Sequence, residues 1–235
     1  MSQYYTKIDT CFKRDLDHDS KTYNCILPDQ GFTRQEFEVL KDLKWEATEK
    51  IDGTNMSYFY SYDPVKNTEI FEIHGKTEAA AIPTHLLVKM QKLVTKEKMR
   101  EVFVKEEGGP ITVQVFGEGY GVKIQKGGNY IKNDTDFILF DVKVGNIFLT
   151  REACEDVAKS LGVKIVPLMG HMTLQEAIDF VDKGFKSTIA ENKDYDAEGL
   201  VLKAPLGLLD RRGQRIITKI KTCDFRQLRL KQGLK

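Results

Sequence analysis

The chain has few of the features that mark secreted, membrane or zinc-stabilised proteins. Its four cysteines are widely scattered, with no CxxC pair and no histidine at zinc-site spacing, so we interpret them as reduced, structural thiols: Cys11, Cys25, Cys154 and Cys223. No apolar run approaches the roughly 20 residues of a membrane-spanning helix. The N-terminal MSQYYTKIDTCFKRD lacks the apolar core of a signal peptide. These absences predict a cytoplasmic protein that does not bind membranes.

Internal repeats, low-complexity tracts and linkers rich in proline, glycine or serine are also missing, so nothing in the sequence indicates a boundary between two large domains. Hydrophobic residues make up 41% of the chain and charged residues 30%, a composition typical of a folded globular protein rather than a disordered one. We therefore predict a single domain over residues 1–235, acting as a monomer. Residues 1–44 form an N-terminal extension to which the sequence assigns no role.

The net charge of +1 conceals an uneven distribution. Between Lys203 and Lys235 there are ten Lys or Arg and two acids, Asp210 and Asp224, so this tail carries 10 − 2 = +8 and the remainder of the chain −7. Such a tail could bind a polyanion; a solvated basic helix or a charged edge strand is the alternative. The arginines that could contact a nucleic-acid backbone are Arg211, Arg212, Arg215, Arg226 and Arg229.

The pattern of apolar residues predicts an α+β fold. Strands are expected where β-branched and aromatic residues cluster between turn signals, at 45–50, 56–62, 68–74, 111–116, 137–142, 146–149, 199–203 and 215–220. Helices are expected at 84–105, 150–161 and 173–185, where apolar residues recur every three or four positions. Strands outnumber helices and do not alternate strictly with them, which favours antiparallel sheets flanked by helices.

The tetrapeptide Lys50-Ile51-Asp52-Gly53 lies at the end of an expected strand, where a reactive side chain can project from the sheet while glycine permits a turn. An amine attacks phosphorus only when it is unprotonated, so a nucleophilic lysine needs burial or neighbouring positive charge to lower its pKa. Taken alone, the tetrapeptide is weak evidence, because such a pattern is more often a strand that ends in an ordinary Asp-Gly turn.

Four further segments come after it in order, and the joint pattern is far more specific than any one of them. Five segments between Trp45 and Lys221 resemble the sequence motifs of the covalent nucleotidyltransferases, the superfamily of polynucleotide ligases and capping enzymes. In chain order these segments are TEKIDGTN, FGEGYG, FILFDV, EGLVLK and KIK. GKTEAAAIPTHLL, GVKIQKGGNY and the asparagine at position 55 resemble the RNA-ligase branch. The resemblance implies a nucleotidyltransferase domain, an ATP-grasp-like adenylation domain with antiparallel sheets flanked by helices.

The resemblance also implies a reaction. Lys50 would attack the α-phosphate of ATP and become lysyl-AMP, the AMP would pass to a 5′-phosphate, and a 3′-hydroxyl would displace it. A divalent ion, Mg²⁺ or alternatively Mn²⁺, would be held by Glu198 and Glu118, because carboxylates are ligands that such ions prefer. A lone glutamate is more often a surface residue, and only the joint pattern promotes these two.

Other residues take nucleotide-binding roles through the same resemblance. Phe140 would stack on adenine beside Asp141, although a lone phenylalanine in an apolar strand is normally a core residue. Lys219 and Lys221 are two apart in a strand and therefore share a face, which suits phosphate binding and catalysis; a charged edge strand is the alternative. The resemblance also gives Glu118 and Glu198 nucleotide-binding roles, with Glu118 as the contact to the ribose. The remaining expected contacts are Glu49, Ile51, Asp52, Gly53, Asn55, Lys76 and Lys203, and Lys76 stands where the family pattern has an arginine.

The expected substrate depends on the length of chain after the last motif. Residues 222–235 are too few for the OB-fold domain that DNA ligases and capping enzymes append to this core, which favours an RNA ligase that acts on nicked or single-stranded RNA ends, as in RNA repair. The alternatives are a minimal DNA ligase, a capping-type guanylyltransferase core, and a catalytically idle nucleic-acid-binding module with the same fold.

Overall fold

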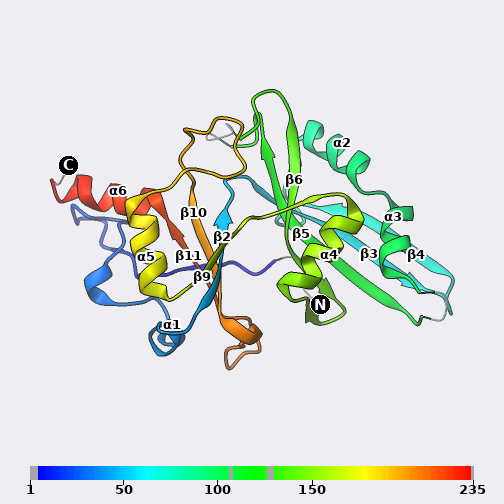
Figure 1. Ribbon diagram of the computed structural model, residues 1–235, viewed down its shortest axis with the longest axis horizontal. Coiled ribbons are helices and arrows are strands. Elements are labelled where there is room, and N and C mark those ends of the chain that lie inside the picture. The colour runs from blue at the N-terminus through cyan, green and yellow to red at the C-terminus, as the bar shows by residue number, and fades with distance from the viewer. Residues whose placement is uncertain (1–4, 106–107, 126–129, 234–235) are drawn as a thin grey trace. The chain divides into compact units, whose positions relative to one another are not determined.

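The computed structural model describes residues 5–105, 108–125 and 130–233, which form two compact units. Unit 1 is built from Asp52–Val166, Ala190–Asn192 and the described part of Met1–Thr6. Unit 2 is built from Lys7–Ile51, Pro167–Ile189 and Lys193–Lys235, as far as residue 233 is described. Each unit has its own sheet, which confirms the predicted α+β class with helices flanking largely antiparallel sheets (Figure 1). The assignment of residues 1–235 to a single domain stays a prediction.

Unit 1 contains a six-stranded sheet in the order β4-β3-β5-β6-β7, with β8 paired to β6. Its strands are β3 (Thr54–Asp63), β4 (Thr68–His74), β5 (Ile111–Gly121), β6 (Thr135–Val144), β7 (Ile147–Phe148) and β8 (Lys164–Ile165). All pairs are antiparallel except β6 with β8. The predicted strands of this unit are present, and β3, β5 and β6 are longer than their apolar runs.

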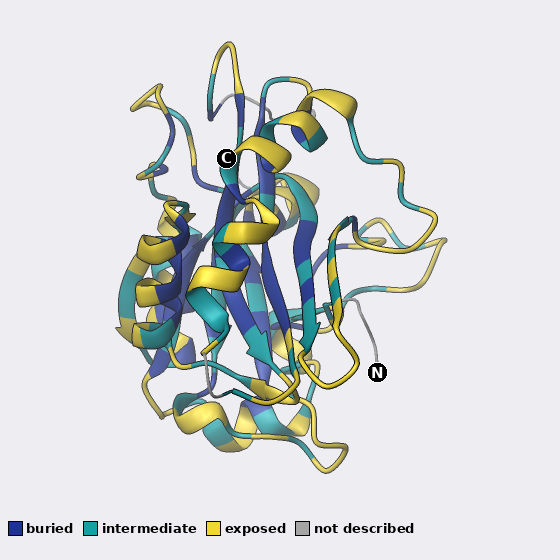
Figure 2. Cartoon of the chain, turned by 90° about the vertical axis from the view of Figure 1, so that its right-hand side faces the viewer, coloured by how far each residue is buried: buried dark blue, intermediate teal, exposed yellow. Residues whose placement is uncertain are grey.

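One face of this sheet carries the unit 1 core. Alternate residues of β3 and β5, such as Tyr58 and Val115, are fully buried against α2 (Thr84–Leu93), α3 (Lys96–Phe103) and α4 (Arg151–Leu161). Dark blue bands on the strands in Figure 2 mark this burial. Each fully buried large apolar side chain contributes roughly 1.5–3 kcal/mol relative to exposure. Because side chains alternate along a strand, the residues between these core positions lie on the other face of the sheet.

The helix predicted over 84–105 is two helices. α2 ends at Leu93 because Val94 is extended, and the Thr95 side chain then accepts a hydrogen bond from the Lys98 amide at 3.3 Å and caps α3. A threonine that caps a new helix competes with continuation of the old one. The apolar periodicity continues through the break because both helices bury the same side, which is why the sequence concealed it.

Unit 2 contains a five-stranded sheet in the order β1-β11-β10-β2-β9. The strands are β1 (Asp9–Thr10), β2 (Trp45–Lys50), β9 (Leu168–Met172), β10 (Gly199–Lys203) and β11 (Ile217–Lys221). The helices are α1 (Gln35–Leu40), α5 (Leu174–Lys183) and α6 (Thr222–Lys231), with short 3-10 turns at Pro28–Gln30 and Pro205–Gly207. β2 and β10 match the predicted bounds, β11 begins two residues later than predicted, and α1, α6, β1 and β9 were not predicted.

Helices cover one face of this sheet as well. Trp45 and Leu200 on the strands pack with Leu174 of α5 and Phe225 of α6 in the unit 2 core. A capping box fixes the start of α5, since the Thr173 side chain accepts the Glu176 amide while the Glu176 carboxylate accepts the Thr173 amide.

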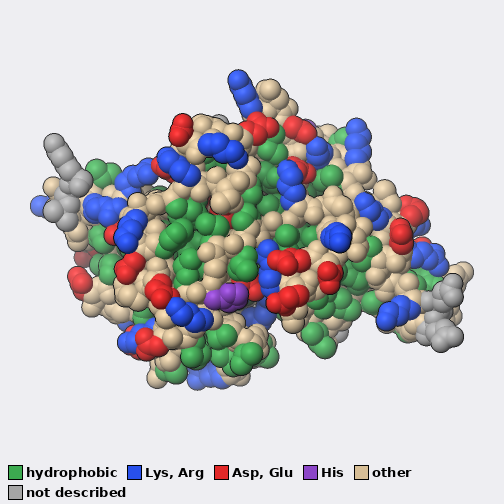
Figure 3. Space-filling view, viewed as in Figure 1, with side chains coloured by type: hydrophobic (Ala, Val, Ile, Leu, Met, Phe, Trp, Pro, Cys, Tyr) green, Lys and Arg blue, Asp and Glu red, His purple; other side chains and the backbone are tan. Residues whose placement is uncertain are grey.

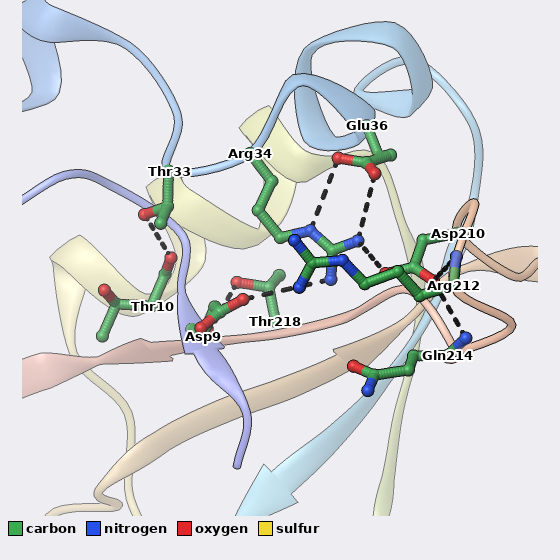
Figure 4. A network of polar contacts seen from close by, with 9 residues as sticks. All are labelled: Asp9, Thr10, Thr33, Arg34, Glu36, Asp210, Arg212, Gln214 and Thr218. Carbon is green, nitrogen blue, oxygen red and sulfur yellow. Dashed lines mark hydrogen bonds and ion pairs between the residues drawn. The ribbon is translucent and has the colours of Figure 1, made fainter. Parts of the chain in front are cut away.

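Residues 7–44 belong to the structure of unit 2 rather than to a separate appendage. Figure 4 shows how Arg34 joins three segments: its guanidinium contacts Asp210 at 2.9 Å and Glu36 at 3.2 Å, and lies 3.9 Å from Asp9. The Asp210 carboxylate also accepts the backbone amides of Arg212 and of Gln214. The edge strand β1, the start of α1 and the 210–214 turn are therefore held by one side chain.

Among the described residues the cysteines form no disulfide: Cys11, Cys25 and Cys154 are buried, as expected of structural thiols, whereas Cys223 is exposed. Across residues 5–105, 108–125 and 130–233, every helix is too short or too polar to cross a bilayer.

The packing of β5 against β6 gives a stability prediction. A Cβ at Gly117 would stand 2.3 Å from Phe137 Cζ and 2.4 Å from the Ile138 carbonyl oxygen. Gly117→Ala should therefore lower the free energy of unfolding by about 1–3 kcal/mol, measured by urea denaturation. Gly109→Ala is the control because a Cβ there meets nothing within 4 Å. Equal stability of the two variants would show that β5 and β6 do not approach so closely.

Candidate functional site

Lysines gather on the face of the unit 2 sheet opposite its helices. Antiparallel pairing sets the side chains of this face in three rows across β2, β10 and β11: Lys50, Gly199 and Lys221; Thr48, Val201 and Lys219; Glu46, Lys203 and Ile217. Directly paired residues point to the same side of a sheet. Lys219 and Lys221 therefore lie on the same face, as predicted, and Lys50 and Lys203 lie on that face too. We call Lys50, Lys203, Lys219, Lys221 and Glu198 the lysine face.

A single carboxylate joins two members of the lysine face. Glu198 Oε2 lies 2.7 Å from Lys50 Nζ and Glu198 Oε1 lies 2.8 Å from Lys221 Nζ. The three side chains are largely buried, at 14% exposure for Glu198, 20% for Lys50 and 30% for Lys221. Both oxygens of Glu198 are thus committed to cations, which fixes the Lys50 amine at the end of β2.

Gly199 makes this arrangement possible. Its φ of +148° is a conformation that L side chains rarely adopt, and a Cβ there would stand 2.0 Å from the Ile220 carbonyl oxygen. The glycine therefore allows β11 to approach β10 and leaves the space between Lys50 and Lys221 to the Glu198 carboxylate.

The two lysines of β11 differ electrostatically. Burial lowers the pKa of Lys219, and the ammonium groups of Lys221, Lys50 and Lys7 lower it further. Burial also acts to lower the pKa of Lys221, but the hydrogen bond and the charge of Glu198 outweigh it, so this pKa is raised. Glu198 thus stabilises the charged form of Lys221, whereas the positive charges around Lys219 disfavour its charged form. A concentration of positive charge of this kind is expected at a site that binds an anion.

Lys203 is the member of the lysine face that lies in the third row, beside Glu46. Lys203 Nζ lies 3.7 Å from Glu46 Oε1, and both side chains are mostly buried, at 19% and 17% exposure. This separation is an ion-pair distance rather than a hydrogen bond.

Glu49 points the other way. It pairs with Leu200 on the core side of the sheet, and its buried carboxylate accepts hydrogen bonds from Ser187 Oγ at 2.5 Å, Thr188 N at 3.0 Å and Thr188 Oγ1 at 2.6 Å. Its side chain ties the 187–188 segment to the strand that carries Lys50. The expectation that Glu49 binds nucleotide stays a prediction. Ile51, which follows Lys50 in the chain, is buried.

The remaining candidates of the tetrapeptide belong to unit 1. The Asp52 amide donates a hydrogen bond to Tyr130 Oη at 3.0 Å. A Cβ at Gly53 would stand 2.4 Å from the Gly119 carbonyl oxygen and 2.7 Å from Glu118 Cγ. The glycine therefore lets the chain pass close to the strand that carries Glu118, a role beyond the turn predicted for it.

The sheet face of unit 1 opposite α2, α3 and α4 collects the other candidates. Asn55 pairs with Glu118, and in the next row Ser57 pairs with Phe116, which pairs with Asp141. A register shift in β6 places Phe140 between Asp141 and Leu139 as the extra residue of a bulge. Four predicted residues thus lie in two adjacent rows of one face: Asn55, Glu118, Phe140 and Asp141.

Lys76 and the arginines are more dispersed. Lys76 is exposed in the loop that follows β4. Arg211, Arg212 and Arg215 lie in the connection between β10 and β11, whereas Arg226 and Arg229 lie on α6, at the other end of these strands (Figure 1). Arg226 contacts Asp196 at 3.3 Å and Arg229 contacts Asp182 at 2.7 Å. The five arginines therefore form two groups, one at each end of β11.

A metal ion would find a partial site. Among the described residues, no group of three or more His, Cys, Asp and Glu side chains is arranged to hold one. Mg²⁺ and Mn²⁺ commonly use one or two carboxylates together with substrate phosphates. Glu198, surrounded by phosphate-attracting lysines, fits that type of ligation.

Sequence reasoning missed Ser187, Thr188 and Tyr5. The first two serve Glu49, and the Tyr5 hydroxyl donates to Asp141 Oδ2 at 2.5 Å. Strand alternation alone could have shown that Glu49 faces away from Lys50. No local signal marks a contact between residues 136 positions apart.

Comparisons with known proteins concern the family and the fold of the chain. The family model described as RNA ligase matches residues 43–221. A solved Naegleria gruberi RNA ligase mutant with ATP and Mn has a TM-score of 0.58 at 22% identity over 82% of this chain and 53% of that chain. Another mutant of that ligase, with AMP and Mn, has a TM-score of 0.58 at 21% identity over 79% and 52%.

These likenesses concern the fold, and the chain spans about half the length of the ligase structures it matches. The family model, in contrast, covers more than half of this chain and includes every residue of the lysine face. The chain belongs to the RNA ligase family.

Proposed function

We propose that the protein is an ATP-dependent RNA ligase that joins a 5′-phosphate to a 3′-hydroxyl through a lysyl-AMP intermediate on Lys50. The observation that carries this proposal is the Glu198 carboxylate, which lies between Lys50 Nζ at 2.7 Å and Lys221 Nζ at 2.8 Å. A lysine held at the end of a strand among further cations suits attack on a polyphosphate.

In the first step the Lys50 nitrogen forms a bond to the α-phosphorus of ATP while the bond to the β-phosphate oxygen breaks. Pyrophosphate leaves, and the unprotonated amine gives up one of its two N–H protons to solvent, so that the phosphoramidate keeps the other. The second step moves AMP from Lys50 to the oxygen of an RNA 5′-phosphate, which restores the lysine. In the third step a 3′-hydroxyl attacks that phosphate, forms the new phosphodiester and releases AMP.

Lys219 and Lys221 supply fixed positive charge in adjacent rows of the lysine face, where negative charge accumulates on the phosphates. Lys203 extends the same charge to the third row. A divalent ion, Mg²⁺ or Mn²⁺, would be held by Glu198 together with the phosphates, and Glu118 is the second candidate ligand. When bound, the ion neutralises phosphate charge and stabilises the leaving pyrophosphate.

Residues of unit 1 are proposed to bind the nucleoside part of ATP. Asn55 and Glu118 offer polar groups in one row, and Phe140 and Asp141 lie at the bulge of the next. An aromatic ring suits adenine stacking. The Naegleria gruberi ligase mutants were solved with ATP or AMP and Mn, which supports a nucleotide and a divalent ion here. Asp52, Gly53, Lys76 and the backbone of Glu49 and Ile51 complete the proposed contacts.

RNA is the proposed polymer because the chain belongs to the RNA ligase family. Arg211, Arg212 and Arg215 form one candidate group for its backbone, and Arg226 and Arg229 form the other. The face shown in Figure 3 intersperses Lys and Arg with Asp and Glu. On this face, backbone binding would therefore depend on a few local contacts rather than on a broad basic surface.

Covalent labelling tests the proposal. Incubation with α-labelled ATP and Mg²⁺, followed by denaturation, should leave label on the protein, and Lys50→Ala should abolish it because no other amine replaces the nucleophile. Lys44→Ala is the matched control, since Lys44 is exposed and pairs with Glu176. Labelling of the Lys50 variant at the rate of the control would refute the proposal, and labelling by GTP alone would favour a capping-type enzyme.

Glu198→Gln tests the carboxylate. Loss of its charge should lower the rate of labelling by about 10–100-fold and raise the Mg²⁺ concentration needed for half-maximal rate, since it both ligates the ion and orients Lys50. The measurement is a Mg²⁺ titration of single-turnover labelling. Glu38→Gln is the control because Glu38 is exposed and pairs with Lys41. An unchanged titration in Glu198→Gln would exclude Glu198 as a metal ligand.

The polymer is tested with nicked duplexes that differ only in the 3′-hydroxyl strand. We expect sealing when that strand ends in RNA and at least about tenfold slower sealing when it ends in DNA, because the 2′-hydroxyl distinguishes the two. Gel separation of the joined product gives both rates. Sealing confined to DNA ends would assign the chain to DNA repair, and the absence of both adenylylation and sealing would favour the idle binding module.

A further inference from the structure

Tyr5 belongs to unit 1 although it precedes the strands of that unit by about fifty residues in the chain. Its hydroxyl donates to the Asp141 carboxylate at 2.5 Å. Its ring packs edge-on with those of Phe140, Phe116 and Phe148, with centroids 4.9, 5.1 and 6.2 Å apart. A single side chain therefore contacts both residues of the nucleotide-binding pair proposed on β6.

The bulge in β6 explains why such a contact matters. In a regular strand, ladder pairing fixes the face to which each side chain points. At Phe140 the register shifts, since Phe116 pairs with Asp141 and Gly117 with Leu139. Packing must then help to set the direction of the Phe140 ring, and bulges that re-aim a side chain are common beside active sites.

Asp141 needs support of another kind. Only 1% of the residue is exposed, and a buried carboxylate is stable only when donors satisfy it. The Tyr5 hydroxyl is such a donor. Because the same residue packs its ring on Phe140, the two neighbours of the bulge are held relative to each other.

We propose that Tyr5 is a positioning residue for nucleotide binding, whose hydroxyl orients the Asp141 carboxylate and whose ring orients Phe140. The inference rests on the proposed function, in which Phe140 and Asp141 bind the nucleoside of ATP. It gives the N-terminal segment a role that the sequence did not indicate. Tyr5 acts through these two residues and takes no part in the bond changes at Lys50.

The test separates binding from chemistry. Tyr5→Phe keeps the ring and removes the hydroxyl, and Tyr5→Leu removes both. Tyr5→Phe should raise the Kd for AMP, measured by calorimetry, and the KM for ATP in Lys50 labelling by about tenfold, the effect of one hydrogen bond to a charged group. Tyr5→Leu should raise both further. The labelling rate at saturating ATP should stay within about twofold of the wild type, because Lys50 and its surroundings are unaltered.

Tyr60→Phe is the matched control. Tyr60 lies on the core face of the same sheet, and its hydroxyl donates to Glu69 Oε1 at 2.7 Å. It therefore loses a tyrosine–carboxylate bond away from the Asn55 and Glu118 row. It should lower the thermal midpoint without changing the Kd for AMP. A double-mutant cycle of Tyr5→Phe with Asp141→Asn should be non-additive, because the hydroxyl acts on that carboxylate.

Three results would overturn the inference: a Kd for AMP in Tyr5→Phe equal to that of the wild type, an increase in this Kd of the same size in Tyr60→Phe, or strict additivity in the cycle. Any of these with normal labelling of Lys50 refutes the role of Tyr5 and leaves the ligase proposal intact. A wild-type protein that neither binds AMP nor takes label overturns both.

Discussion

The ion pairs of Glu198 with Lys50 and Lys221 are the interaction on which the site of unit 2 depends. They join Lys50 at the end of β2 to Lys221 at the end of β11, on the two sides of β10. They require a glycine at position 199, because the strand between the two lysines must carry no side chain there. Without the carboxylate, two ammonium groups would face each other in a largely buried setting, which is costly. Strand pairing and these ion pairs together thus gather a nucleophile candidate, a metal-ligand candidate and a phosphate-binding candidate.

Much of the fold can be predicted from sequence patterns. β2, β4 and β10 have the predicted bounds because their alternation is strong and turn signals flank them. The helix over 84–105 divides at Thr95, where a local cap prevails over an apolar stripe that runs through both parts. α1 and β1 escaped prediction because they are short, and tertiary contacts such as those of Arg34 hold them (Figure 4). Propensity and periodicity do not encode such contacts.

The candidate site, too, has features that the sequence predicts and features that it does not. That Lys219 and Lys221 share a face follows from strand periodicity, and the candidate roles of Lys50 and Glu198 come from family motifs. That one carboxylate bridges Lys50 and Lys221 could not be predicted, since it depends on a side chain 148 positions from Lys50. The bulge at Phe140 is invisible to alternation, and so is the contact of Tyr5 with Asp141. Sequence patterns identify the elements, but they do not encode this long-range side-chain geometry.

That Lys50 is the amine that accepts AMP is tested most directly by locating the adduct. After incubation with ATP and Mg²⁺, the protein would be digested at neutral pH, because acid cleaves phosphoramidates, and its peptides analysed by tandem mass spectrometry. We predict AMP on Lys50 alone, within the peptide that contains Ile51 and Asp52. AMP on Lys219 or Lys221, or no adduct on any lysine, would contradict this role of Lys50.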